Sequence, residues 1–245
     1  MIFRNLIFSA LLVGMISGII YGAFQHIAIT PLISAAEEYE VLAPNDATPQ
    51  HDDDHGDHSH DHLLSTELGR PALTVLSNIL IGTAFSIFLI ALMALHNYKS
   101  SKPAVNRWRG TLWGVTLLIV IFAAPAYFGL HPELPGTIAS ALEYRQFWWI
   151  MCSTSAATGI ALLYYLAVKY KPLGLLIVSA PHVFAEKSPM ELKFSNPAPE
   201  AIEALTSLTH QFFSMTAIGM VLFCLLIGAL SGFATERFVS LDSEN

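Results

Sequence analysis

The sequence predicts an all-α integral membrane protein with about five transmembrane helices, and three observations lead to that prediction. First, 53% of the 245 residues are hydrophobic and 13% are charged, which is too little charge to cover a water-exposed surface. Second, the apolar residues form runs of about twenty or more, long enough to cross a hydrocarbon core roughly 30 Å thick. Third, much of the acid behind the formal net charge of -7 lies in one loop, including five aspartates between Asp52 and Asp61. The net charge is therefore a property of that loop and gives no information about the fold.

The first predicted transmembrane helix covers residues 1–33, in which Arg4 precedes an apolar run over residues 6–24. A cleaved secretory signal peptide is the alternative, but the apolar core of a signal is usually about 7 to 15 residues, and this run is longer. The run also contains three glycines at a spacing of four, Gly14, Gly18 and Gly22. That spacing places them on one helix face and predicts close packing against a second helix.

Four further spans are expected within residues 71–233, which would form the rest of the helical bundle. They lie at about residues 71–95, 110–130, 147–168 and 206–233. A shorter apolar stretch near residues 173–184 contains Pro181 and predicts a buried or re-entrant hairpin, with a sixth crossing as the alternative. Residues 234–245 form a short tail, and both cysteines lie inside apolar runs, where we interpret them as packing residues.

The distribution of lysine and arginine predicts the orientation, because cytoplasmic loops retain positive charge during insertion. With five spans and a cytoplasmic N-terminus, the residues expected in the cytoplasm are Arg4, Lys99, Lys102, Arg107, Arg109, Lys169, Lys171, Lys187 and Lys193. Those expected outside are Arg70, Arg145 and Arg237. This arrangement places the loop of residues 34–70, the tail and the C-terminus outside the cytoplasm.

Residues 51–62 of that loop read HDDDHGDHSHDH, a composition that cannot form a core. Imidazole nitrogen and carboxylate oxygen suit divalent cobalt, nickel, copper and zinc ions. The predicted ligands are His51, Asp52, Asp53, Asp54, His55, Asp57, His58, His60, Asp61 and His62. We expect this external loop to be disordered and to bind metal, more weakly below about pH 6.5, where histidine is protonated. A solvated charged linker and an expression tag are the alternatives.

Other candidate ligands lie at predicted helix ends. Residues 129–136, GLHPELPG, interrupt the third span and place His131 and Glu133 beside the loop, unless they form only a rigid proline turn. Arg145 can pair with Glu133 or Glu143. Three further histidines are possible pathway ligands, or else ordinary polar residues: His26, His182 and His210. His182, in the short apolar stretch, and His210, at the start of the last span, are candidates to meet.

Several motifs, in order, resemble the CbtA family, a predicted cobalt transporter subunit of bacteria. They are Glu37-x-Tyr39-Glu40, Gly69-Arg70, Trp113-Gly114, GLHPELPG at residues 129–136, Arg145-Gln146-x-Trp148-Trp149 and Ala180-Pro181-His182. The resemblance implies a multi-pass protein of the bacterial cytoplasmic (inner) membrane that takes up cobalt for cobalamin biosynthesis, with a small one-span CbtB-type partner. The family commonly has proline where this chain has His131, so Glu133 is the better candidate for a shared role.

Together these observations favour a metal-ion uptake protein that is not an enzyme and has neither an organic cofactor nor a nucleic-acid partner. The external loop would capture cobalt, nickel, zinc or copper, and the ion would pass the bundle along Glu133, His182 or His210. The sequence has no G-x-x-x-x-G-K-[ST] phosphate loop, so membrane potential, an ion gradient or a partner must drive transport. The alternatives are a metal-binding accessory or sensor protein that transports nothing and a haem-binding membrane redox protein.

Overall fold

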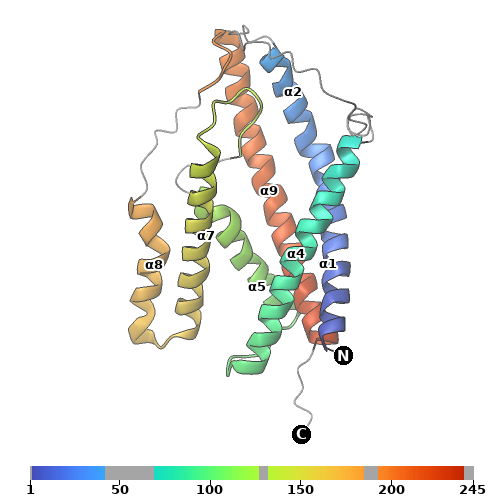
Figure 1. Ribbon diagram of the computed structural model, residues 1–245, viewed down its shortest axis with the longest axis vertical. Coiled ribbons are helices and arrows are strands. Elements are labelled where there is room, and N and C mark those ends of the chain that lie inside the picture. The colour runs from blue at the N-terminus through green and yellow to red at the C-terminus, as the bar shows by residue number, and fades with distance from the viewer. Residues whose placement is uncertain (1, 42–68, 127–131, 185–192, 240–245) are drawn as a thin grey trace, which may run out of the picture.

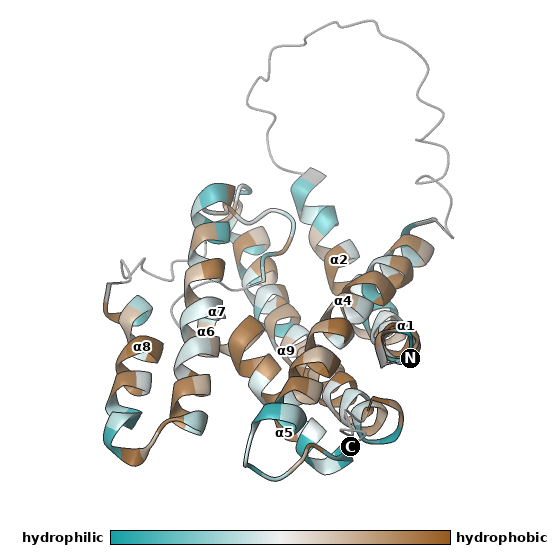
Figure 2. Cartoon of the chain, turned by 60° about the horizontal axis from the view of Figure 1, so that its bottom comes forward, coloured by the Kyte–Doolittle hydropathy of each residue, from teal (hydrophilic) through white to brown (hydrophobic). Residues whose placement is uncertain are grey.

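The computed structural model describes residues 2–41, 69–126, 132–184 and 193–239, and this part of the chain is a bundle of long helices (Figure 1). Five helices are long and apolar enough to cross a membrane, as predicted. They are Phe3–Glu40, Gly69–Lys99, Arg107–Ala126, Leu142–Tyr165 and Pro199–Phe238. Figure 2 shows hydrophobic residues along the lengths of the helices and hydrophilic residues gathered near their ends. Many large apolar side chains point outward, as expected of a surface that faces lipid.

The two ends of the bundle differ, and we name them by their contents. At the loop end, α2 (Thr30–Val41) ends and α4 (Gly69–Lys99) begins, on either side of residues 42–68. At the basic end, α1 (Ile2–Phe24) begins and α9 (Pro199–Phe238) ends. The Asn5 side-chain amide donates a hydrogen bond to the Phe238 carbonyl oxygen at 3.1 Å. The first helix therefore begins and the last helix ends at the same end of the bundle, whereas the five-span arrangement expected them at opposite ends.

The reason is α8 (Lys171–Phe184), which follows α7 (Leu142–Tyr165) through a short 3₁₀ turn and packs against it. Fourteen residues of helix span about 21 Å, less than a hydrocarbon core. Even so, α8 leads the chain away from the basic end (Figure 1). The backbone N–H of Ile138 donates to the Lys193 carbonyl at 2.8 Å, so the chain has returned to the loop end by Lys193. The predicted hairpin is thus a helix that adds a sixth traverse.

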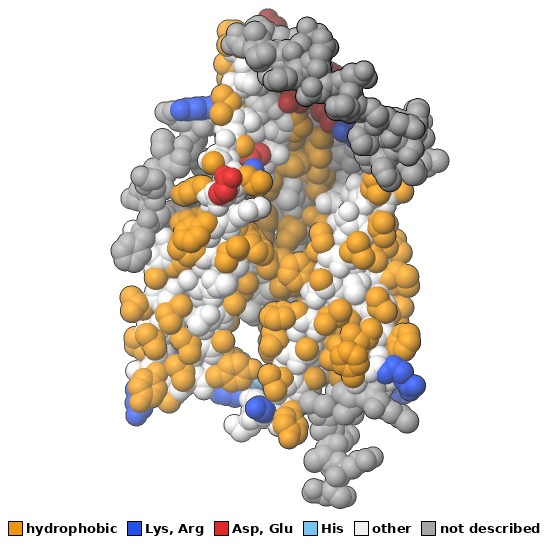
Figure 3. Space-filling model, viewed as in Figure 1, with side chains coloured by type: hydrophobic (Ala, Val, Ile, Leu, Met, Phe, Trp, Pro, Cys, Tyr) orange, Lys and Arg blue, Asp and Glu red, His pale blue; other side chains and the backbone are white. Residues whose placement is uncertain are grey.

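This sixth traverse also corrects the charge assignment. Lys193 moves to the loop end and Arg237 to the basic end, which is the reverse of the prediction for both, whereas Lys187 lies outside the described residues. The basic end then holds Arg4, Lys99, Lys102, Arg107, Arg109, Lys169, Lys171 and Arg237. Of the lysines and arginines in the described ranges, only Arg70, Arg145 and Lys193 lie at the loop end. Figure 3 shows blue side chains concentrated at the bottom of the molecule.

The glycines of the first helix lie against α4. A Cβ atom added at Gly18 would lie 2.5 Å from the Cα of Ile79, and one at Gly14 would overlap the backbone of Thr83. Gly22 lies beside Val75 in the same interface. The two helix backbones are therefore in contact along three turns, an approach that any larger side chain would prevent.

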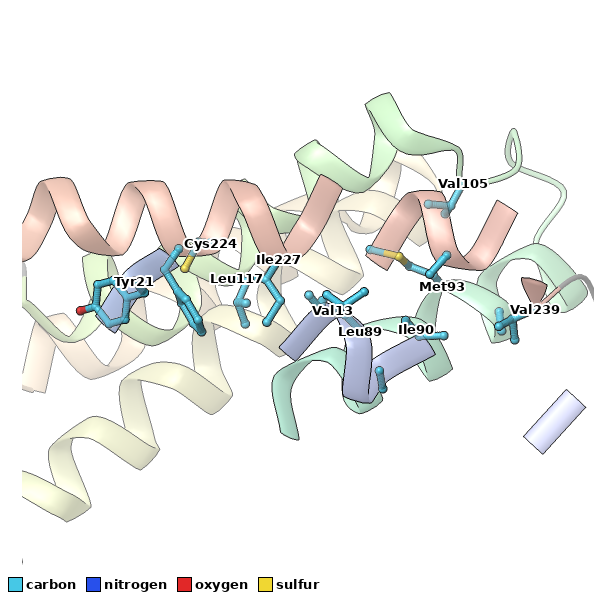
Figure 4. Packing of buried hydrophobic residues seen from close by; sticks show 14 residues of the cluster. Val13, Tyr21, Leu89, Ile90, Met93, Val105, Leu117, Cys224, Ile227 and Val239 are labelled. Carbon is cyan, nitrogen blue, oxygen red and sulfur yellow. The ribbon is translucent and has the colours of Figure 1, made fainter. Parts of the chain in front are cut away.

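A second glycine interface joins α5 (Arg107–Leu118) to α9. A Cβ atom at Gly228 would lie 2.5 Å from the Cα of Gly114, and one at Gly232 would lie 2.6 Å from the Cα of Gly110. The interface was not among the sequence predictions, although both helices carry glycines at a spacing of four. Both glycine interfaces border one apolar core, which α1, α4, α5 and α9 share (Figure 4).

Prolines explain how α7 attaches to the third span. The π-helical segment η2 (Ile119–Ala123) and α6 (Ala124–Ala126) follow α5, and Pro125 has no N–H to donate to the Ile121 carbonyl four residues earlier. The Trp149 indole N–H donates to that carbonyl at 2.9 Å, and the Trp148 indole donates to the Pro125 carbonyl at 3.0 Å. A similar π-helical segment, η1 (Gln25–Ile29), lies ahead of Pro31, and α2 then carries the first helix to Val41, beyond the predicted end at residue 33.

Candidate functional site

At the loop end, the two helices on either side of residues 42–68 lie next to each other. Arg70, near the start of α4, lies 3.4 Å from a carboxylate oxygen of Glu37 in α2, measured from Nη2 to Oε1. The ten predicted ligands from His51 to His62 lie outside the described residues. The chain therefore leaves the bundle for residues 42–68, and returns from them, at the loop end.

Glu133 and Arg145 form the second feature of this end. The Arg145 Nη1 lies 3.0 Å from the Glu133 Oε2, so of the two predicted partners it is Glu133 that Arg145 pairs with. About a third of each side chain is exposed, at 30% for Glu133 and 32% for Arg145. A charged pair that water still reaches can be exchanged for another partner at small cost, because exposed pairs contribute little stability. His131 lies outside the described residues.

The segment that carries Glu133 is held firmly over the start of α9. Leu134 is buried against Leu205, and Gly136 adopts a φ of +80°, which favours glycine. The Ser195 N–H donates to the Gly136 carbonyl at 2.9 Å. Thr137 also pairs with Phe194 in an antiparallel bridge. The backbone on both sides of Gly136 is thus fixed, and Glu133 is positioned by a rigid support.

The three candidate pathway histidines lie on different helices. His26, in η1, and His210, in α9, are both exposed. His182, in α8, lies edge-on to Trp148, with 6.1 Å between the ring centroids. The helix α8 packs against α7, whereas α9 packs against α1, α2, α4 and α5, so His182 and His210 lie on helices with different main neighbours. Within the described ranges, no group of three or more His, Cys, Asp or Glu side chains could hold a metal ion.

Buried polar side chains follow the interface between α1, α4 and α9, and the sequence predictions did not include them. Asn78 donates to the Gln25 side chain toward the loop end. Deeper in the bundle, the hydroxyls of three fully buried serines have no hydrogen-bond partner among the residues that the structure places: Ser17, Ser86 and Ser231. Toward the basic end, the Thr235 hydroxyl lies 2.8 Å from the Ser231 carbonyl and 3.7 Å from the Met93 sulfur. Oxygen donors thus occur at several depths of this interface.

The comparison with known families identifies the family of the chain. The sequence model of one family, described as a probable cobalt transporter subunit (CbtA), matches residues 3–236, which is nearly the whole chain. The chain belongs to the CbtA family. No curated protein and no solved structure matches this CbtA chain significantly.

Membership of this family indicates which substrate the candidate site would bind. The family is described as a probable cobalt transporter subunit, a description that implies a cobalt ion as substrate and at least one other subunit, and the five long apolar helices make this CbtA chain a multi-pass membrane protein. Divalent cobalt is a borderline ion that takes both imidazole nitrogen and carboxylate oxygen. The loop end of this CbtA chain offers the Glu133 carboxylate, and the tract of residues 51–62, which lies outside the described residues, contains both donor types in its sequence.

Proposed function

We propose that this CbtA protein is the membrane subunit of a divalent metal-ion uptake transporter, with cobalt as its substrate, and that it is not an enzyme. The observation that carries the proposal is the family match across residues 3–236. The protein resides in the bacterial cytoplasmic (inner) membrane, with the basic end in the cytoplasm and the loop end outside. The concentration of lysine and arginine at the basic end supports this orientation, because positively charged loops are retained in the cytoplasm.

In the first step, the histidine and aspartate tract of the external loop captures the ion. Its overlapping ligand sets raise the local metal concentration but select poorly among metals, because copper, nickel and zinc generally bind such donors better than cobalt. Any selectivity for cobalt over other metals therefore comes from the helical bundle or from which metals are available.

Deleting residues 51–62 is expected to raise the cobalt concentration that gives half-maximal uptake by about tenfold, equivalent to roughly 1.4 kcal/mol of binding free energy. Maximal uptake at saturating cobalt should stay near the wild-type value, because the deletion removes capture and leaves the bundle intact. A matched control keeps the length of the tract and replaces its five histidines by asparagine. It separates the effect of losing imidazole ligands from the effect of shortening the loop. Uptake measured with radioactive cobalt in cells tests this, and complete loss at every concentration would contradict a capture role.

In the second step, the ion reaches Glu133, where it replaces Arg145 as the partner of the carboxylate. The exposure of the pair gives the ion access, and the fixed backbone around Gly136 keeps the carboxylate in place. Beyond it, His26, His210 and His182 remain candidate ligands. The oxygen donors from Gln25 and Asn78 down to Thr235 offer a route between α1, α4 and α9.

Glu133→Gln should lower maximal cobalt uptake by about tenfold or more, equivalent to roughly 1.4 kcal/mol, because an amide carries no negative charge to attract the dication. Glu143→Gln is the matched control, since Glu143 is an exposed acid in the first turn of α7 and forms no ion pair in the described part of the chain. Both proteins should reach the membrane in wild-type amounts. Equal uptake by the two variants would remove Glu133 from the route.

The energy for uptake comes from the membrane potential, an ion gradient or a partner. An inside-negative potential contributes about 2.3 kcal/mol per charge for each 100 mV, so a dication is drawn inward. A small one-span CbtB-type subunit is the proposed partner.

Proteoliposomes containing this chain, with and without that partner, test transport directly. Metal binding without uptake in either preparation would favour the accessory or sensor function. A Soret absorption band in the purified protein would favour the haem-binding alternative.

A further inference from the structure

A cavity of about 750 Å³ opens between α4, α5 and α7 in the half of the bundle near the basic end. We call it the lateral window. Within its wall, the hydroxyl of Tyr165 in α7 lies 2.7 Å from the Nδ1 of His96 in α4, and this contact joins the two helices. Toward the loop end, α7 contacts η2, and the Trp149 indole donates to the Ile121 carbonyl there. Figure 3 shows an opening between the helices at this level, above the basic side chains.

The wall of the lateral window is almost entirely apolar. Phe88, Leu95, Leu112 and Ala161 contribute to it from three helices, together with other apolar side chains of the same helices. His96 is one of the few polar residues in this wall, and both of its ring nitrogens are engaged. The carbonyl of Pro103, 3.3 Å from Nε2, can only accept, so Nε2 donates and Nδ1 accepts from the Tyr165 hydroxyl. The interior therefore favours a hydrocarbon occupant over a polar one.

Cations line the mouth of the same cavity. Lys99, at the end of α4, and Arg109, in the first turn of α5, both line the lateral window. Lys102 adds a third positive charge 5.6 Å from the centre of the Tyr164 ring, which also lines it. Among the residues that the structure describes, none of these three cations forms an ion pair with a carboxylate. Basic pockets between transmembrane helices bind anionic lipid headgroups in this way.

From this combination we infer that the lateral window binds one anionic phospholipid, with an acyl chain in the cavity and the phosphate at Lys99 and Arg109. Charge complementarity favours a lipid over a transmembrane helix of a partner, because cations lie beside an apolar cavity, as a phosphate headgroup and its acyl chain require. The lipid would hold α4 and α5 apart from α7 where these helices are not packed together.

Native mass spectrometry of the full chain, titrated with phosphatidylglycerol or phosphatidylcholine, tests the inference. The wild type is expected to retain one phosphatidylglycerol in preference to phosphatidylcholine. Lys99→Gln should weaken this binding about fivefold, and Lys99→Gln with Arg109→Gln about 30-fold, from the usual contribution of one lysine or arginine near a membrane surface. The single variant leaves intact the hydrogen bond that Arg109 donates to the Ala104 carbonyl at 2.6 Å.

Two further variants make the test decisive. Lys169→Gln with Lys171→Gln removes the same charge from the same end of the bundle but away from the window, and should change binding less than twofold. Ala161→Trp fills the apolar wall and should abolish retention of the lipid while the protein stays monodisperse. Equal wild-type binding of the two lipids would overturn the inference. So would retention of phosphatidylglycerol by Ala161→Trp, or an equal loss in the control pair.

Discussion

Gly114→Leu is expected to prevent the protein from accumulating in a folded form. A Cβ atom at this position would overlap the Cys224 carbonyl of α9 and lie 3.2 Å from the Cα of Gly228. The atoms in the way belong to the backbone, so no rotamer change can make room. Overpacking in a core typically costs about 1–3 kcal/mol. Here α5 and α9 must also separate along the whole interface, which adds the loss of the contacts between Gly110 and Gly232.

Val115→Leu is the matched control, because it places the same side chain at the next position of α5, where the native valine is exposed. We expect its yield and unfolding temperature to match those of the wild type. Gly114→Leu should instead give aggregated protein on size exclusion after detergent extraction, or an unfolding temperature lower by roughly 4 °C or more. A monodisperse Gly114→Leu protein with wild-type stability would show that the two backbones are not in contact.

Hydropathy was sufficient to predict the five long spans, because length and apolar content are local properties of the sequence. The glycine spacing likewise predicted a close helix contact for the first span, and Gly14 and Gly18 do lie against α4. The same rule applied to Gly110, Gly114, Gly228 and Gly232 would have predicted the second interface.

The role of α8 could not be predicted in this way, because its 14 residues are too few for a span and it contains Pro181. It packs on α7 through a tertiary contact, in which a Cβ atom at Gly174 would lie 2.9 Å from the Gly159 carbonyl. No window of sequence shows that contact.

The part of the candidate site that could be predicted from the sequence is the part that depends on charge and on position along the chain. Glu133 and Arg145 flank the same interruption of the helices, and their pairing follows from that. The buried serines were not predictable, because a single hydroxyl in an apolar span shows no preference for a face. Ser17 is fully buried, and whether it faces lipid or the interior depends on the packing of three helices, which periodicity alone does not fix.

A reagent that cannot cross the membrane is expected to reach position 237 from the cytoplasm and not from outside. This position is where the structure differs most from a simple five-span arrangement. Five crossings place the two termini on opposite sides, whereas α8 makes the number of traverses even. The hydrogen bond from Asn5 to the Phe238 carbonyl holds the start of α1 and the end of α9 together at the basic end. The positive charge there predicts that this end is cytoplasmic.

Single cysteines test this arrangement through labelling by a membrane-impermeant maleimide. The native Cys152 and Cys224 are both buried, so background labelling should be low. We expect Arg237→Cys to be labelled only after the membrane is permeabilised, and Ile138→Cys, at an exposed position of the loop end, to be labelled in intact cells. The contrast should be nearly all or none, because a charged reagent does not cross the bilayer.

Lys102→Cys is the control for the basic end, since both the five-span and the six-traverse arrangements place it in the cytoplasm. Only Arg237→Cys distinguishes the two. Labelling of Arg237→Cys in intact cells, with Lys102→Cys protected, would mean that α8 does not return the chain across the membrane. The contact between Asn5 and Phe238 could then not exist in the bilayer. Protection of both, with Ile138→Cys labelled, requires the even number of traverses that the structure contains.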